Sequence, residues 1–251
     1  MEKGARSRAM TNRKLTISIF RYNPNDPVNK PAMVDYQVEE SERMTLFMAL
    51  NKIREEQDPS LVFDFVCRAA ICGSCAMLIN GEPSLACKTL TKGMPDRITL
   101  VPLPFFKLVG DLSVDTGTWF RGLNERTQAW IHTDKKFDPT DGEDIMKNKT
   151  AQEIYEAERC VECGCCIGGC ATIKMNNQFI GAAGINRVAR FMVDPRDERT
   201  DGQFFEIVGN EMGTFGCIGL MACDDYCPMS IPLQNQLAYV RRNMAIAGIK
   251  G

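Results

Sequence analysis

The chain has 251 residues, of which 44% are hydrophobic and 25% are charged, and its formal net charge is −2 at pH 7. This composition predicts one large or two small folded domains and excludes wholesale disorder. The charge argues against a nucleic-acid partner held by a broad basic face. Twelve cysteines stand against a single histidine, and this ratio guides the functional analysis.

The N-terminal segment carries several Arg and Lys residues, but no apolar core follows them. Residues 1–14 therefore predict a disordered tail and not a secretory signal. No run of about 18 apolar residues is present, so no membrane-spanning helix is expected. A chain that is not exported meets a reducing compartment, where clustered cysteines indicate metal binding more than disulfides.

Residues 15–118 are expected to form a small α+β domain. Alternation of apolar and polar residues predicts strands, and these are expected at 15–19, 34–38, 76–79 and, last in the domain, 97–101. Ser41 is predicted to cap the helix that follows it. Asn80-Gly81 predicts a hairpin turn, and the strand after this turn is expected to carry Cys87.

Residues 119–251 are expected to form an all-α domain. Residues 132–149 are polar and are interpreted as an exposed connection. Thr150 and Glu153 have the spacing of a capping box and predict the start of a helix that leads to Cys160. Later helices are expected at residues 185–192, ended by Asp194-Pro195, and from Pro232 to Val240.

The first cysteine group has three members in a tight loop and a fourth further on: Cys67, Cys72, Cys75 and Cys87. This spacing is typical of plant-type [2Fe–2S] ferredoxins, because one short loop can surround a small inorganic core with three thiolates. Gly73 and Ser74 are small enough to let backbone N–H groups face the sulfurs. A zinc ribbon, the alternative, uses two separated C-x2-C pairs and fits this spacing less well.

The second group has the C-x2-C-x2-C-x3-C spacing of bacterial ferredoxins: Cys160, Cys163, Cys166 and Cys170. A shift of 57 residues places it on the third group, which is Cys217, Cys223 and Cys227. Pro228 follows the last of these, as in the ferredoxin motif. Leu220 occupies the position equivalent to Cys163, so the internal repeat lacks one cysteine.

In two-cluster ferredoxins the fourth cysteine of each run binds the other cluster. The complete set expected for a [4Fe–4S] cluster is Cys160, Cys163, Cys166 and Cys227. The other set, Cys170, Cys217 and Cys223, has three thiolates and predicts [3Fe–4S]. In an alternative, water, Asp224 or Asp225 holds a fourth iron. Cys165 is left over, and a small buried thiol is favoured over a redox role for it.

Other cofactor motifs are missing from the sequence. His132 is the only histidine, and a Rieske centre needs two. No G-x-G-x-x-G and no Walker A motif occurs, so no nucleotide site is indicated. The chain is therefore expected to carry electrons and to hold no catalytic residue of its own.

Residues 65–75, 159–166 and 227–228 resemble the iron–sulfur subunits of fumarate reductase and succinate dehydrogenase. The similarity runs from about residue 15 to 240 and is greatest to fumarate reductases anchored by a dihaem cytochrome b. The resemblance implies a β-grasp [2Fe–2S] ferredoxin domain followed by an all-α, bacterial-ferredoxin-like domain. It also implies electron transfer between FAD in a catalytic subunit and quinone or haem in a membrane subunit.

The resemblance further implies a peripheral position on the cytoplasmic face of the inner (cell) membrane, with the [2Fe–2S] site towards the flavin and the [3Fe–4S] site towards the membrane. Many members have Pro and Trp after the cysteine equivalent to Cys170 and His after that equivalent to Cys217. Ala171 and Ile218 stand there instead, which favours delivery to a haem over a quinone pocket on this chain. A free polycluster ferredoxin is the alternative function, and a structural zinc protein is a third.

Overall fold

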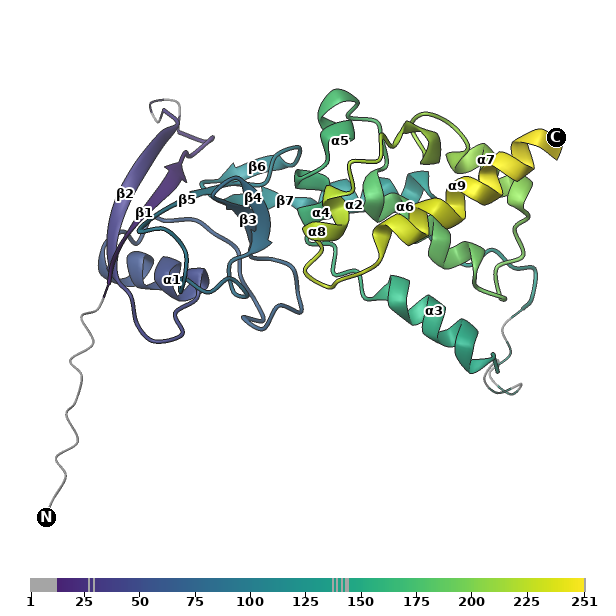
Figure 1. Ribbon diagram of the computed structural model, residues 1–251, viewed down its shortest axis with the longest axis horizontal. Coiled ribbons are helices and arrows are strands. Elements are labelled where there is room, and N and C mark those ends of the chain that lie inside the picture. The colour runs from purple at the N-terminus through teal and green to yellow at the C-terminus, as the bar shows by residue number, and fades with distance from the viewer. Residues whose placement is uncertain are drawn as a thin grey trace, which may run out of the picture.

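The computed structural model describes residues 13–250 except 27, 29, 137, 139, 141, 143 and 144. It has a sheet half at the N-terminus and a helical half at the C-terminus (Figure 1). The predicted tail lies outside the described residues apart from Arg13 and Lys14, and Lys14 already opens the first strand. Within the described part of the chain, no helix is long and apolar enough to cross a membrane.

The sheet half contains a five-stranded mixed sheet in the order β2-β1-β5-β3-β4. Its strands are β1 (Lys14–Arg21), β2 (Ala32–Glu39), β3 (Ala76–Ile79), β4 (Glu82–Leu85) and β5 (Arg97–Val101). β1 pairs antiparallel with β2 and parallel with β5. β3 pairs antiparallel with both β4 and β5. The four predicted strands are therefore confirmed, and Leu15, Ile17 and Ile19 of β1 are fully buried.

Helix α1 (Leu46–Glu56) packs its apolar residues into the same core as β1 and β5. The predicted cap is wrong, because Thr45 and not Ser41 accepts the N–H of Met48. Ser41 opens a turn in which its carbonyl accepts the N–H of Met44. Arg43 in this turn has φ +59°, a left-handed conformation that no helix can continue. The helix therefore starts only after the turn has closed.

The predicted hairpin turn between β3 and β4 is confirmed, since Asn80 has φ +51° and Gly81 has φ +88°. Cys87 lies in the turn after β4 and not on the strand. β5 is not the last strand, because β6 (Lys107–Gly110) and β7 (Ser113–Asp115) form a further hairpin. The buried carboxylate of Asp111 supports this hairpin by accepting backbone N–H groups from two distant segments.

The helical half is built around two long helices, α6 and α9, which pack against each other. The helices here are α2 (Thr116–Arg126), α3 (Asn148–Glu158), α4 (Cys165–Gly168), α5 (Ala171–Met175), α6 (Gly181–Met192), α7 (Asp201–Val208), α8 (Ala222–Asp225) and α9 (Leu233–Lys250). The helices predicted at 185–192 and after Pro232 are thereby confirmed. In Figure 1 the short helices α4 and α8 lie where this half meets the sheet half.

Two other expectations for this half need correction. Helix α3 begins at Asn148, and its N-cap Lys147 makes no side-chain cap, so Thr150 lies inside the first turn and forms no capping box. The capping box of this half belongs to Thr200 and Gln203 at the start of α7. In the polar stretch, residues 132–136 have no helix or strand, as expected. Its last two residues already belong to α3.

Candidate metal centres

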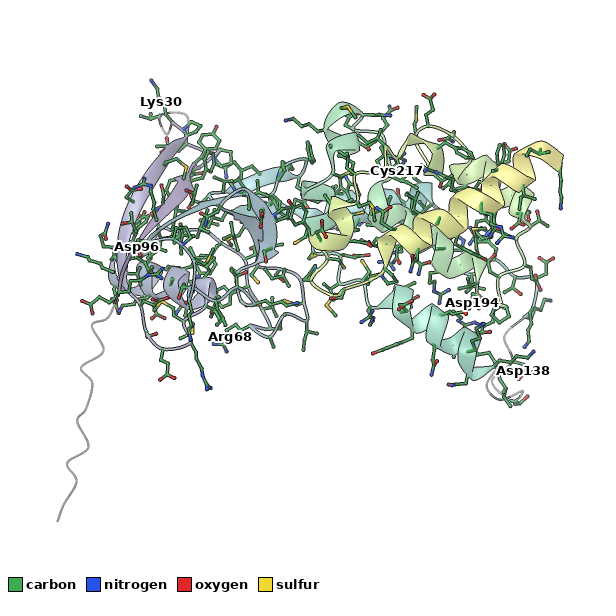
Figure 2. The ribbon with its side chains drawn as sticks, in the orientation of Figure 1. Lys30, Arg68, Asp96, Asp138, Asp194 and Cys217 are labelled. Atoms are coloured by element: carbon green, nitrogen blue, oxygen red, sulfur yellow. The ribbon has the colours of Figure 1, made fainter. Side chains whose placement is uncertain are left out.

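All twelve cysteines lie among the described residues, and each is a free thiol. The first group is in the sheet half, and the other two groups are in the helical half. Figure 2 labels Arg68 beside the first group and Cys217 in the third, and the two lie in opposite halves of the molecule. In the described part of the chain, no group of three or more His, Cys, Asp or Glu is arranged around a single metal ion.

The loop between α1 and β3 surrounds the first group with backbone N–H donors. Arg68, Ala70 and Gly73 have φ of +55°, +59° and +76°, and these left-handed residues coil the loop. The Cys67 sulfur accepts the N–H groups of residues 69, 71 and 72, each at an N···S distance of 3.3 Å. The N–H of Ala70 reaches the sulfur of Cys87 at 3.3 Å, which ties the distant fourth cysteine to the loop.

The two remaining sulfurs of the group also accept hydrogen bonds. The hydroxyl of Ser74 donates to Cys72 at 3.3 Å, and the N–H of Cys87 donates to Cys75 at 3.4 Å. Burial opposes ionisation of Cys72, but Ser74 and backbone N–H groups outweigh it and lower the pKa of this thiol to about 6. Donors on every sulfur are what a negatively charged cluster requires. The four residues therefore fit a [2Fe–2S] cluster.

The second set lines a small cavity of about 20 Å³ in the helical half. All four expected residues contribute to its wall: Cys160, Cys163, Cys166 and Cys227. Burial, followed by the neighbouring Cys163, Cys160 and Cys227, raises the pKa of Cys166 well above its usual value. The structure thus places Cys227 with three cysteines that lie more than sixty residues earlier in the chain.

The third set lines a separate cavity of about 60 Å³. Cys170, Cys217 and Cys223 are all in its wall, together with Leu220 and Gln234. Burial raises the pKa of Cys223 to about 11, although the hydrogen bond from Gln234 opposes this shift. Cys170 therefore lines the cavity of the third set and Cys227 that of the second set, and the binding of clusters by these sets stays a prediction.

The backbone repeats with the same 57-residue shift as the sequence. Gly164 (φ +83°) and Met221 (φ +63°) are equivalent, and each stands immediately before a four-residue helix, α4 or α8. Glu162 (φ +51°) and Gly219 (φ +75°) are also equivalent and also left-handed. Leu220 therefore follows the same backbone course as Cys163, but it brings an apolar side chain to the wall of the cavity.

The alternative ligands for a fourth iron differ in their surroundings. One carboxylate oxygen of Asp224 accepts the backbone N–H of Gln234 at 3.0 Å, so Asp224 helps to cap helix α9. Neither Asp224 nor Asp225 is among the residues that line the cavity of the third set. The residues present fit a cluster with three protein ligands, because Leu220 stands at the position equivalent to Cys163 and has no atom that binds iron.

Cys165 is fully buried and packs with the core of the sheet half. A hydrogen bond to Cys163, followed by burial, raises the pKa of Cys165 far above its ordinary value. The Cys165 thiol is thus a neighbour of Cys163 and lines neither of the two cavities. Its burial agrees with the prediction of a small buried thiol at this position.

The first and second groups meet at the junction of the two halves. A Cβ atom placed on Gly73 would lie 2.8 Å from the carbonyl oxygen of Val161 and 2.9 Å from the Cβ of Cys163. Only glycine fits this contact, because even a methyl group would overlap both neighbours. Lys88, next to Cys87, donates from Nζ to the carbonyl of Pro228, next to Cys227, at 2.8 Å.

Two residues of α9 that were not expected to lie at a metal site contact the third group. Gln234 Nε2 donates to the sulfur of Cys223 at 3.1 Å. Arg241 Nη2 donates to the carbonyl oxygens of Thr214 and Cys217 at 3.0 and 2.9 Å. These contacts depend on the packing of α9 against the third group, so the spacing of the cysteines alone does not predict them.

Comparison with known proteins defines the class. Residues 16–121 match the family described as a 2Fe-2S iron-sulfur cluster binding domain. Residues 156–231 match the family described as a 4Fe-4S dicluster domain. The chain is thus an α+β iron–sulfur protein with a [2Fe–2S] ferredoxin domain followed by a 4Fe–4S ferredoxin-like domain.

Full-length relatives define the family. The chain is 55% identical over 233 residues to the fumarate reductase iron–sulfur subunit of Wolinella succinogenes, covering 92% of this chain and 98% of the relative. It is 33% identical over 231 residues to a mitochondrial succinate dehydrogenase (ubiquinone) iron–sulfur subunit of Oryza sativa subsp. japonica, covering 90% and 80%. The chain belongs to this family of fumarate reductase and succinate dehydrogenase iron–sulfur subunits.

The fold is shared with a solved structure as well. A chain of the Mycobacterium smegmatis Sdh1 complex in the apo form superposes with a TM-score of 0.79 at 22% identity, covering 94% of this chain and 97% of that one. The similarity extends over both halves, so the relative placement of sheet half and helical half belongs to the shared fold.

Proposed function

We propose that this chain is the electron-transfer iron–sulfur subunit of a membrane-bound fumarate reductase or succinate dehydrogenase complex. It relays electrons between FAD in a catalytic subunit and quinone or haem in a membrane subunit. The observation that supports this function most is the exchange of Cys170 and Cys227 between the two cavities of the helical half. This exchange makes one folding unit of two cluster sites, and Gly73 brings the first site against it.

The proposed cofactors are one [2Fe–2S], one [4Fe–4S] and one [3Fe–4S] cluster. Their ligands are, in that order, Cys67, Cys72, Cys75 and Cys87; Cys160, Cys163, Cys166 and Cys227; and Cys170, Cys217 and Cys223. The first set belongs to a β-grasp domain proposed at residues 15–118 and the others to a helical domain proposed at 119–251. Helix α2 spans the boundary between residues 118 and 119 and connects the two.

Bound clusters supply one-electron carriers, and the chain's own residues set the conditions for them. Backbone N–H groups and Ser74 stabilise negative charge on the sulfurs of the first set. In the helical half, the cysteines of the other sets are half-buried, which reduces the access of water to their sulfurs. No side chain of the chain is assigned to substrate chemistry, which belongs to the catalytic subunit.

The proposed partners follow from the family and from exposed apolar residues near two sites. Val66 and Ile71 on the first loop are 72% and 67% exposed, which suits contact with the FAD-containing subunit. Ile218, Leu220 and Met221 beside the third set are at least half exposed and suit a cytochrome b subunit, proposed to be dihaem. The chain would then be held peripherally on the cytoplasmic face of the inner membrane.

Potentiometric EPR of the detergent-purified complex tests this function. We expect about nine irons per chain with acid-labile sulfide, three distinct cluster signals, and co-purified flavin and haem. About three zinc ions and no cluster signal would show a structural zinc protein instead. A chain that elutes alone with its clusters, without flavin or haem, would show a free ferredoxin.

A further inference from the structure

The amide of Gln234 forms a direct hydrogen bond with a cysteine of the third set. Its Nε2 atom lies 3.1 Å from the sulfur of Cys223, and an amide nitrogen can only donate in this contact. The side chain is half-buried and forms part of the cavity wall together with Cys170, Cys217 and Cys223. The donor and its acceptor are thus both half-buried, and partial burial strengthens the electrostatic effect of their hydrogen bond relative to one in open solvent.

The position of Gln234 is fixed by its own backbone hydrogen bond and by a second contact further along α9. Its backbone N–H donates to Asp224 at 3.0 Å, which joins the start of α9 to the helix that carries Cys223. Seven residues later, on the same face of α9, Arg241 holds the carbonyl oxygens of Thr214 and Cys217. Between them, Leu237 is buried and lines the same cavity. One face of α9 therefore holds two of the three cysteines.

We propose that Gln234 is a positioning residue of the third site that raises the reduction potential of the [3Fe–4S] cluster through its hydrogen bond to Cys223. This inference rests on the proposed function, because it requires a cluster at that site. Reduction adds negative charge to the cluster and its thiolates. A donor on a thiolate stabilises the reduced form more than the oxidised form and so favours reduction.

The variant Gln234→Leu removes the donor and keeps most of the volume of the side chain. In an EPR redox titration of the purified complex, we expect the three-iron signal to titrate at a lower potential. The expected change is about tenfold in the reduction equilibrium, which is about 59 mV for a one-electron couple. Gln234→Glu should lower the potential at least as far, because a carboxylate cannot donate and repels the thiolate.

Gln236→Leu is the matched control, since it is the same substitution on the same helix. Gln236 does not line the cavity, and the amide that donates to Cys223 belongs to Gln234. The reduction potential of the three-iron cluster in Gln236→Leu should equal that of the wild type. If Gln234→Leu and Gln236→Leu both titrate like the wild type, the proposed role of Gln234 is wrong.

A measurement on the unmodified chain covers the case in which Gln234→Leu does not assemble. Pulsed EPR of the oxidised three-iron signal, with ¹⁵N in the glutamine side-chain amides, should show a weak nitrogen coupling that Gln236→Leu retains. A three-iron signal without this coupling overturns the role of Gln234. A complex with no three-iron signal at all overturns the cluster assignment itself, so the two failures are distinguishable.

Discussion

The first site and the two helical sites hold their cysteines by different physical means. In the first loop, left-handed residues direct donors to every sulfur, and the loop surface is exposed at Ile71. In the helical half, Cys166 and Cys223 are half-buried, and burial is the largest cause of their raised pKa values, as it is for Cys75 of the first site. A loop can organise the first site locally. The helical sites require two repeats to pack against each other, so they depend on the tertiary fold.

The largest effect is expected where one residue connects distant parts of the chain. Cys227→Ala removes the fourth thiolate from the cavity of the second set, although Cys227 belongs to the third cysteine group in the sequence. We expect loss of the [4Fe–4S] signal and of about four irons per chain, with the [2Fe–2S] signal retained. Iron analysis and EPR of the purified complex measure both.

Two controls accompany this variant. Cys165→Ala removes a buried thiol that neighbours Cys163 but lines neither cavity, so the number of thiolates in each set and the iron content should stay unchanged. Cys170→Ala should abolish the three-iron signal and not the four-iron signal. If the effects of Cys170→Ala and Cys227→Ala are interchanged, the exchange of cysteines between the repeats is wrong.

A change of cluster type is expected from Leu220→Cys. Leu220 follows the backbone course of Cys163, so a cysteine there adds a fourth thiolate to the third set. The three-iron EPR signal of the oxidised complex should be lost and the iron content should rise by about one per chain. Leu220→Ala, which adds no ligand, should keep the three-iron signal. An unchanged signal and iron content in Leu220→Cys would contradict this assignment.

The sequence predicts the cysteine sets well, but it does not predict the contacts that form only when distant segments pack together. The cysteine groups and their exchange follow from spacing and an internal repeat, and the cavities bring the same cysteines together. Their binding of iron stays a prediction. Contacts that depend on tertiary packing could not be predicted from the sequence. Gln234 reaches Cys223 only because α9 folds back, and the β6–β7 hairpin depends on Asp111 contacting Tyr22 and Val62.

Gly73→Ala tests the contact between the two regions through stability. The substitution combines the strain of φ +76° with overlap on Val161 and Cys163, for a cost of about 2–4 kcal/mol. We expect the melting temperature to fall by about 4–16 °C at a fixed scan rate. Gly81→Ala carries similar strain at φ +88° with no atom within 4 Å, and should cost about 1 kcal/mol. Equal effects of both variants would mean that the junction adds nothing.

The smallest effect is expected from one donor among many. Ser74→Ala removes the hydroxyl that donates to Cys72, while backbone N–H groups still serve the first site. The reduction equilibrium of the [2Fe–2S] cluster should change about threefold, a fall in potential of roughly 30 mV. Ser84→Ala is the control, since Ser84 bonds to Thr89 and not to a cysteine. A shift in Ser74→Ala as large as that of Gln234→Leu would contradict the comparison. The sulfur of Cys72 accepts several hydrogen bonds, so it should depend less on any one donor than the half-buried sulfur of Cys223, whose donor is the amide of Gln234.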